Sequence, residues 1–328
     1  MDKPQEEMQE LGFFAIYKEA IKTIHSMKKI FTQITLTFIL PLSFIFLAHF
    51  IIVSIIDWKI ERDERSVYYS NVENEHLYRK LSHEWIGYWI FKIIYLSTLL
   101  LFSLLATAAV VYTIANIYSG NDVTFKTVLK VVPKVWKRLA LTFLWTYFGF
   151  FIYNVVTGVV FFIWSTTTTY STFAIVMFYI LLAFYFIGFV YITALWQLAS
   201  VVTVLESAYG LKAMMKANSL IKGKRWLSWF VFFGLYCIFV GILILFFVFV
   251  WDGFLGIIVG LVCVFLVMVL FLVGYVVQTM LYFVCKSYHR EPIDRMGLSS
   301  QLGGYLGEFE PAFKVNNDIQ LGQPQVQV

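Results

Sequence analysis

The chain has 328 residues, of which 60% are hydrophobic, 20% aromatic and 14% charged, and its formal net charge is +5. Soluble domains carry about 25% charged residues, so the composition excludes an ordinary soluble protein and indicates an integral membrane protein. Because the net charge is small, the positions of the charges are more informative than their sum.

The chain opens with a polar segment, residues 1–29, which we expect to be cytosolic and amphipathic. The apolar stretch that follows, about residues 30–56, exceeds the roughly 20 residues that cross a bilayer. It is also too long for the core of a cleavable signal peptide. We therefore expect an uncleaved signal anchor, kinked at Pro41.

Six apolar stretches are long enough to cross a membrane. They cover approximately residues 30–56, 88–118, 139–164, 172–204, 227–251 and 254–284. Short uncharged or nearly uncharged turns join the third stretch to the fourth and the fifth to the sixth. The predicted fold class is all-α integral membrane, with six transmembrane helices arranged as three hairpins, each preceded by an amphipathic interfacial helix.

Lysine and arginine are concentrated in four segments, which hold nineteen of the 25. These segments are residues 1–29, 119–138, 205–226 and 285–328. Since basic residues gather on the cytosolic side of membrane proteins, we expect cytosolic termini and two cytosolic loops flanking a membrane domain of residues 30–284. Residues 57–87 form the luminal or external loop, and the tail is expected to be largely disordered. We place the protein in an endomembrane, foremost the endoplasmic reticulum, or in the plasma membrane.

One spacing recurs in three of the basic segments. In each of these segments two lysines lie four residues apart, and a basic pair and then an apolar span follow them. The lysines are Lys18 and Lys22, Lys126 and Lys130, and Lys212 and Lys216. Apolar residues at helical spacing beside the lysines are typical of helices in the headgroup region. Pro133 should break or kink the second helix, and Gly223 should end the third. The plain alternative is that basic residues precede any outward span.

Three polar residues stand out near the ends or middles of the spans. Gln197 and Gln278 lie within the fourth and sixth stretches, where an interhelical hydrogen bond is the ordinary role and a polar substrate path is the alternative. Glu206 ends the fourth stretch and is expected to cap the next helix or to pair with a lysine of the third repeat. A functional role for Glu206 stays open.

A resemblance to a known family rests on the stretch around the third repeat. It is carried by Glu206, Gly210, Ala213, Ser219, Leu220 and Gly223. These positions resemble the six-span membrane-domain family that includes YciC-like proteins and the membrane part of bacterial glycerophosphodiester phosphodiesterases. The whole chain also resembles plant uncharacterised transmembrane proteins labelled polyadenylate-binding-protein-binding. The resemblance implies the six-span fold, but the phosphodiesterase catalytic domain is a separate barrel for which this chain has no room.

No catalytic motif or metal-ligand spacing occurs in the sequence, so we predict no catalytic residues, cofactor or metal. The leading hypothesis is a non-enzymatic multi-pass endomembrane protein that organises membrane lipid or partner proteins through its basic interfacial helices. The expected partners are the bilayer, anionic lipids of the cytosolic leaflet and proteins that contact the tail, without direct nucleic-acid binding. The alternative is a transporter or lipid-translocating protein with a cavity between the hairpins near Gln197, Glu206 and Gln278.

Overall fold

A computed structural model describes residues 9–69, 75–121, 123–167 and 172–291. Its described residues form helices and no strand, and six helical segments are long and apolar enough to cross a membrane. This confirms the predicted all-α membrane class. Most of the tail, whose disorder was predicted, lies outside the described residues.

The helices follow one another with short connections. They are α2 (Phe13–Ser26), α3 (Lys28–Ile34), the π-helical turn η1 (Thr35–Ile39), α4 (Leu40–Tyr69), α5 (Glu75–Ser119), α6 (Phe125–Thr167), α7 (Thr172–Leu205), α8 (Leu211–Ile221), α9 (Arg225–Phe249) and α10 (Gly253–Tyr288). The first span combines α3, η1 and α4. Its π-helical turn lies just before Pro41, whose missing N–H prevents the regular bond to the preceding turn.

Consecutive long helices lie side by side: α4 packs on α5, α6 on α7, and α9 on α10. Helix α10 is the central element, since it contacts α2, α4, α5, α7 and α8 as well as α9. Ten consecutive residues of α10, Val276–Cys285, are buried. A helix that is apolar on all sides is expected in such an enclosed position.

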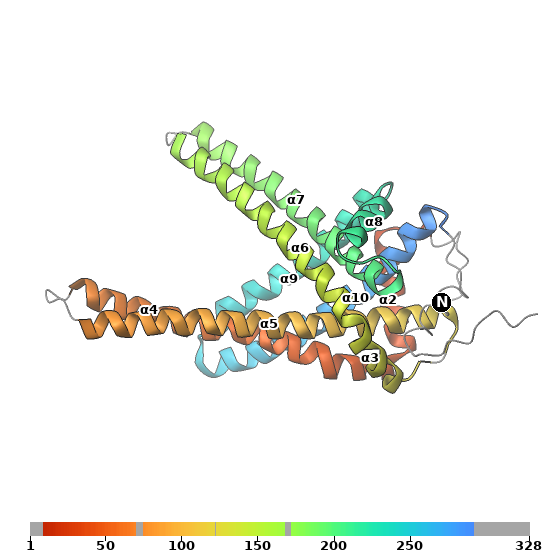
Figure 1. The fold of residues 1–328 in the computed structure, drawn as a ribbon, viewed down its shortest axis with the longest axis horizontal. Helices are drawn as coiled ribbons and strands as arrows, with labels where there is room; N and C mark the ends of the chain where they lie inside the picture. The colour runs from red at the N-terminus through yellow and green to blue at the C-terminus, as the bar shows by residue number, and fades with distance from the viewer. Residues whose placement is uncertain (1–8, 70–74, 122, 168–171, 292–328) are drawn as a thin grey trace, which may run out of the picture.

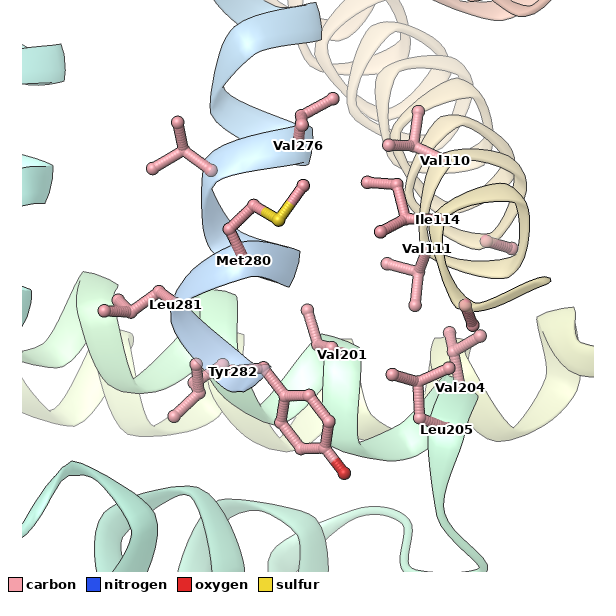
Figure 2. Close-up of a cluster of buried hydrophobic side chains, with 14 of the residues drawn as sticks. Val110, Val111, Ile114, Val201, Val204, Leu205, Val276, Met280, Leu281 and Tyr282 are labelled. Carbon is pink, nitrogen blue, oxygen red and sulfur yellow. The ribbon is translucent and has the colours of Figure 1, made fainter. Parts of the chain in front are cut away.

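The short helices α2 and α8 lie at one end of the bundle, together with the last turns of α5, α7 and α10 and the first turns of α6 (Figure 1). We call this the basic end, because the three lysine segments lie there. Figure 2 shows an apolar layer close to this end, formed by three helices. Its labelled members are Val110, Val111 and Ile114 of α5, Val201, Val204 and Leu205 of α7, and Val276, Met280, Leu281 and Tyr282 of α10. We call this the core layer.

The segment 57–87 is helical in its described part, which corrects the predicted loop. Helix α4 continues to Tyr69 and α5 begins at Glu75. Lys80 Nζ lies 2.7 Å from Asp63 Oδ2, and Lys59 Nζ lies 3.0 Å from Glu84 Oε1, so ion pairs join the two helices. Hydropathy marks where apolar sequence ends, whereas ion pairs between the two helices let them continue beyond that point.

The second lysine segment is not a separate helix, so Pro133 does not break the chain before the third span. The alternative, that Pro133 kinks the helix, stays a prediction. Helix α6 continues without a break from Phe125 to Thr167, with Pro133 inside it. Proline costs one helical hydrogen bond, but the valines on both sides of it are buried: Val128, Val131, Val132 and Val135. Packing of this apolar face holds the helix together across the proline.

Candidate functional site

The lysines of the repeat are exposed at the basic end. Five of them are exposed: Lys18 and Lys22 on α2, Lys126 and Lys130 on α6, and Lys212 on α8. The sixth, Lys216, is partly buried, and its Nζ lies 2.5 Å from Glu291 Oε1. The basic end therefore presents lysines of three separate helices to its surroundings.

Helix α2 has one face on the bundle and another turned outward. Ile16, Ala20 and Thr23 are buried, and α2 packs on α10 and α9. Phe14 and Ile21 are 82% and 59% exposed, and they lie on the same helix as the exposed lysines. The outer face thus combines large apolar side chains with positive charge.

A partly buried tyrosine anchors α2 to the fifth span. Tyr17 donates a hydrogen bond from its hydroxyl to the carbonyl oxygen of Val231 at 2.6 Å. Burial raises the pKa of Tyr17 from its ordinary value of 10.0 to about 12, because the ionised phenolate would lose its hydration. The bond fixes the position of α2 on α9.

Helix α8 shows the same division between an inner and an outer face. Ala213 and Ala217 are buried, and their small side chains let α8 approach α7 closely. Leu211 and Met215 are exposed, at 47% and 64%, beside the exposed Lys212. Two helices of the basic end, α2 and α8, therefore each display large apolar side chains and lysine on an outward face.

Glu206 binds to α10, which corrects both expected roles. Tyr282 donates from its hydroxyl to Glu206 Oε1 at 2.6 Å, and Lys286 Nζ lies 3.1 Å from the same oxygen. Helix α8 begins after Gly210 without a side-chain cap. Glu206 therefore joins the end of α7 to α10 and takes no part in capping α8.

The link between α7 and α8 is also held by α6. The Arg138 guanidinium donates to the carbonyl oxygens of Glu206 and Ser207 at 3.2 and 2.6 Å. The N–H of Gly210 donates to the hydroxyl of Thr142 at 2.8 Å. Gly210 has a φ of +61°, which favours glycine.

Gly223 occupies a second tight position in this region. Its φ is +95°, and a Cβ at this residue would lie 2.2 Å from Cε1 of Tyr288. Three positions of the family resemblance thus have structural reasons. Glu206 forms hydrogen bonds to α10, and Gly210 and Gly223 have positive φ angles that favour glycine.

Gln197, Gln278 and Glu206 are not brought together. Gln197 lines a cavity of about 330 Å³ between the spans. Gln278 is fully buried, and its Nε2 and Oε1 have no hydrogen-bond partner among the described residues. Glu206 lies beyond the core layer at the basic end. The predicted hydrogen bonds between spans are therefore not formed by these glutamines with described residues.

A lysine–histidine pair between α4 and α5 was not predicted from the sequence. Lys92 Nζ lies 3.3 Å from His49 Nε2, and the His49 ring stacks on Tyr95 with centroids 3.7 Å apart. The two charged or titratable groups are 43 residues apart, so the pairing of α4 with α5 brings them together. In the described part of the chain, no three His, Cys, Asp or Glu residues are grouped to hold a metal ion.

Comparison with known proteins gave one match. A family model described as "Domain of unknown function (DUF8558)" matches residues 1–324, nearly the whole chain. Neither the curated proteins nor the solved structures contain a match.

Proposed function

The chain belongs to the DUF8558 family, and we propose that it is a non-enzymatic multi-pass membrane protein that binds anionic lipids at its basic end. The observation that carries the proposal is the outer surface of α2 and α8. There, exposed Phe14 and Met215 accompany the exposed lysines of the repeat. Apolar side chains that enter the acyl boundary, next to lysines that meet phosphate groups, are typical of helices lying on a membrane surface.

In this proposal the protein has three membrane hairpins, and the basic end faces the cytosol of an endomembrane, as the distribution of lysine and arginine favours. The α2 and α8 helices lie in the headgroup region, while the first turns of α6 contribute Lys126 and Lys130. The ion-paired ends of α4 and α5 extend on the opposite side. The structural support for this arrangement is the common location of the three lysine segments.

Lipid binding would draw on both charge and prior ordering of the helices. A lysine near an anionic leaflet contributes about 1 kcal/mol. Helices α2 and α8 are already fixed to the bundle, so lipid binding does not have to order them, which favours affinity. A fixed pattern of lysines would gather anionic lipids around the protein and organise the adjoining leaflet.

Lipid translocation is the second candidate, and the cavity favours it. The core layer lies between that cavity and the basic end, since along α5, α7 and α10 the buried residues follow the cavity residues directly. A compact apolar layer across the route disfavours passage of a charged headgroup. This arrangement favours binding over transport.

The test uses the full chain in bilayers that contain spin-labelled phosphatidylserine or spin-labelled phosphatidylcholine. Electron paramagnetic resonance measures the fraction of each lipid immobilised at the protein. We expect a preference of about fivefold for phosphatidylserine, as one lysine contact supplies. A variant with the five exposed lysines changed to glutamine should lose it, and the matched lysine-to-arginine variant should keep it. If the glutamine variant prefers phosphatidylserine as strongly as the arginine variant does, the proposal is overturned.

A further inference from the structure

We propose that the cavity between the spans binds the alkyl chain of an uncharged lipid that carries a hydroxyl or carbonyl oxygen. The cavity is distinct from the basic end. The proposal rests on the placement of that end at the membrane surface, from which the depth of the cavity is measured, but not on its binding of anionic lipids. Its volume is about 330 Å³, and residues of α4, α5, α6, α7, α9 and α10 line it. That volume is at the lower end of the roughly 300–1,000 Å³ of small-ligand sites, which suits one chain and not a two-chain phospholipid.

The cavity lies at the depth of the hydrocarbon. Gln197 is eight residues before the end of α7 at Leu205, and Ser103 is sixteen residues before the end of α5 at Ser119. At about 1.5 Å per residue, these two lining residues lie roughly 12 and 24 Å from the basic end. The hydrocarbon core is about 30 Å thick, so the molecules that surround the cavity are lipid chains.

The route into the cavity leads from the bilayer. The core layer of α5, α7 and α10 (Figure 2) lies toward the basic end, because its buried residues follow the cavity residues along each of these helices. Lining residues Phe46, Leu99 and Leu270 are partly exposed, and the cavity is partly open. An occupant can therefore enter sideways without crossing the headgroup region of the basic end.

The lining selects an uncharged occupant. Half of the sixteen lining residues are aromatic, and none of the sixteen is charged. A phosphate or ammonium group at this depth would lack a counter-charge, which is strongly unfavourable. Aromatic walls with a few neutral polar groups are the usual lining of a site for an apolar ligand.

Gln197 supplies a free hydrogen-bonding group. Its main-chain oxygen accepts a bond from Ser200 Oγ at 2.7 Å, but its side-chain amide has no hydrogen bond to any described residue. Three other polar side chains of the cavity contact the protein. Thr107 donates to the Ser103 carbonyl at 2.8 Å, and Ser103 Oγ lies 3.4 Å from Tyr275 Oη. An unpaired amide in hydrocarbon is unfavourable, and a hydroxyl or carbonyl oxygen on the occupant would pair with it.

Gly274 offers a way to fill the cavity. It lines the cavity, and a Cβ at this position would meet its nearest neighbour, Leu235 Cδ1, at 4.0 Å, which is ordinary contact. Gly274→Leu therefore inserts a side chain without a clash at Cβ, and leucine favours a helix over glycine. Gly260→Leu is the matched control on α10, because a Cβ there meets nothing within 4 Å and Gly260 does not line the cavity.

The experiment uses the full chain in phosphatidylcholine nanodiscs and a C16 alcohol with a photoactivatable diazirine in its chain. We expect saturable labelling that maps to the segments around Gln197 and Gly274. Gly274→Leu should lower it by at least about tenfold, and Gly260→Leu should leave it unchanged. Gln197→Leu should weaken labelling by the alcohol while labelling by a matched diazirine alkane stays the same.

Three results would overturn the proposal. The first is equal labelling of the wild type and Gly274→Leu, with both proteins monodisperse. The second is stronger saturable labelling by a diazirine phosphatidic acid or a diazirine sterol than by the alcohol. The third is that Gln197→Leu weakens labelling by the alcohol and by the alkane to the same extent, which would show that the amide has no role. Loss of the phosphatidylserine preference in the lysine variants would leave all of these outcomes unaffected.

Discussion

Replacing Glu206 with alanine should destabilise the basic end. Glu206 and Lys286 are only 19% and 18% exposed, and Glu206 Oε1 also accepts the bond from Tyr282 at 2.6 Å. Removing one member of a buried ion pair costs about 3–5 kcal/mol, because the other charge stays buried without its partner. The Glu206–Lys286 pair is only partly buried, and Lys286 keeps its contact with the Tyr282 hydroxyl at 3.1 Å. We therefore expect the lower limit, about 3 kcal/mol of unfolding free energy.

The assay is reversible unfolding of the detergent-solubilised full chain by sodium dodecyl sulfate, followed by tryptophan fluorescence. Glu206→Gln is the matched control, since it keeps an acceptor oxygen for Tyr282 and removes the charge that faces Lys286. We expect it to lose about 1.5 kcal/mol, the lower value for one hydrogen bond to a charged group. A loss below about 0.5 kcal/mol for Glu206→Ala, as at ordinary surface positions, would refute the structural role of this residue.

Three further changes test the contacts that place α2 and α8, with the same unfolding measurement. Tyr17→Phe should cost about 1 kcal/mol of unfolding free energy. Because burial raises the folded-state pKa of Tyr17 from 10.0 to about 12, the unfolded chain loses the proton first, and wild-type stability should fall between those pH values. The variant should show a smaller fall. Gly223→Ala should cost at least about 1–3 kcal/mol, since its φ is +95° and its Cβ would strike Tyr288; an unchanged stability would contradict the placement of α10 against this turn. Thr142→Val should cost about 1–3 kcal/mol by leaving the N–H of Gly210 without its acceptor, and Thr142→Ser should restore most of it.

The sequence is sufficient to predict the spans, because membrane helices need long apolar stretches whatever their neighbours are. It is not sufficient to predict where the helices stop. The charged segment after the first span continues as helix because Lys80 of α5 meets Asp63 of α4, and such pairs depend on how two helices align. Pro133 gives a local signal for a break, yet buried valines on both sides outweigh it.

The candidate site shows the same limit. Exposed lysines at the basic end follow from the positive-inside pattern and from the recurring spacing. The partners of Glu206 do not, since Tyr282 and Lys286 are 76 and 80 residues away along the chain. Closeness along the chain favours a partner for Glu206 in the adjoining helix α8, whereas packing of α10 beside the end of α7 supplies the partner.

The most direct test of the central claim is the depth of α2 and α8 in the bilayer. Spin labels would replace Phe14 and Met215 one at a time in a cysteine-substituted full chain, in nanodiscs that contain phosphatidylserine. Power saturation with oxygen and with a water-soluble nickel complex gives the depth of each label. We predict that both labels lie just below the phosphate groups, with oxygen contact exceeding nickel contact, and that a label at Lys22 contacts the nickel complex more. If both labels are fully accessible to the nickel complex, the claim that this end of the protein lies on a membrane surface is contradicted.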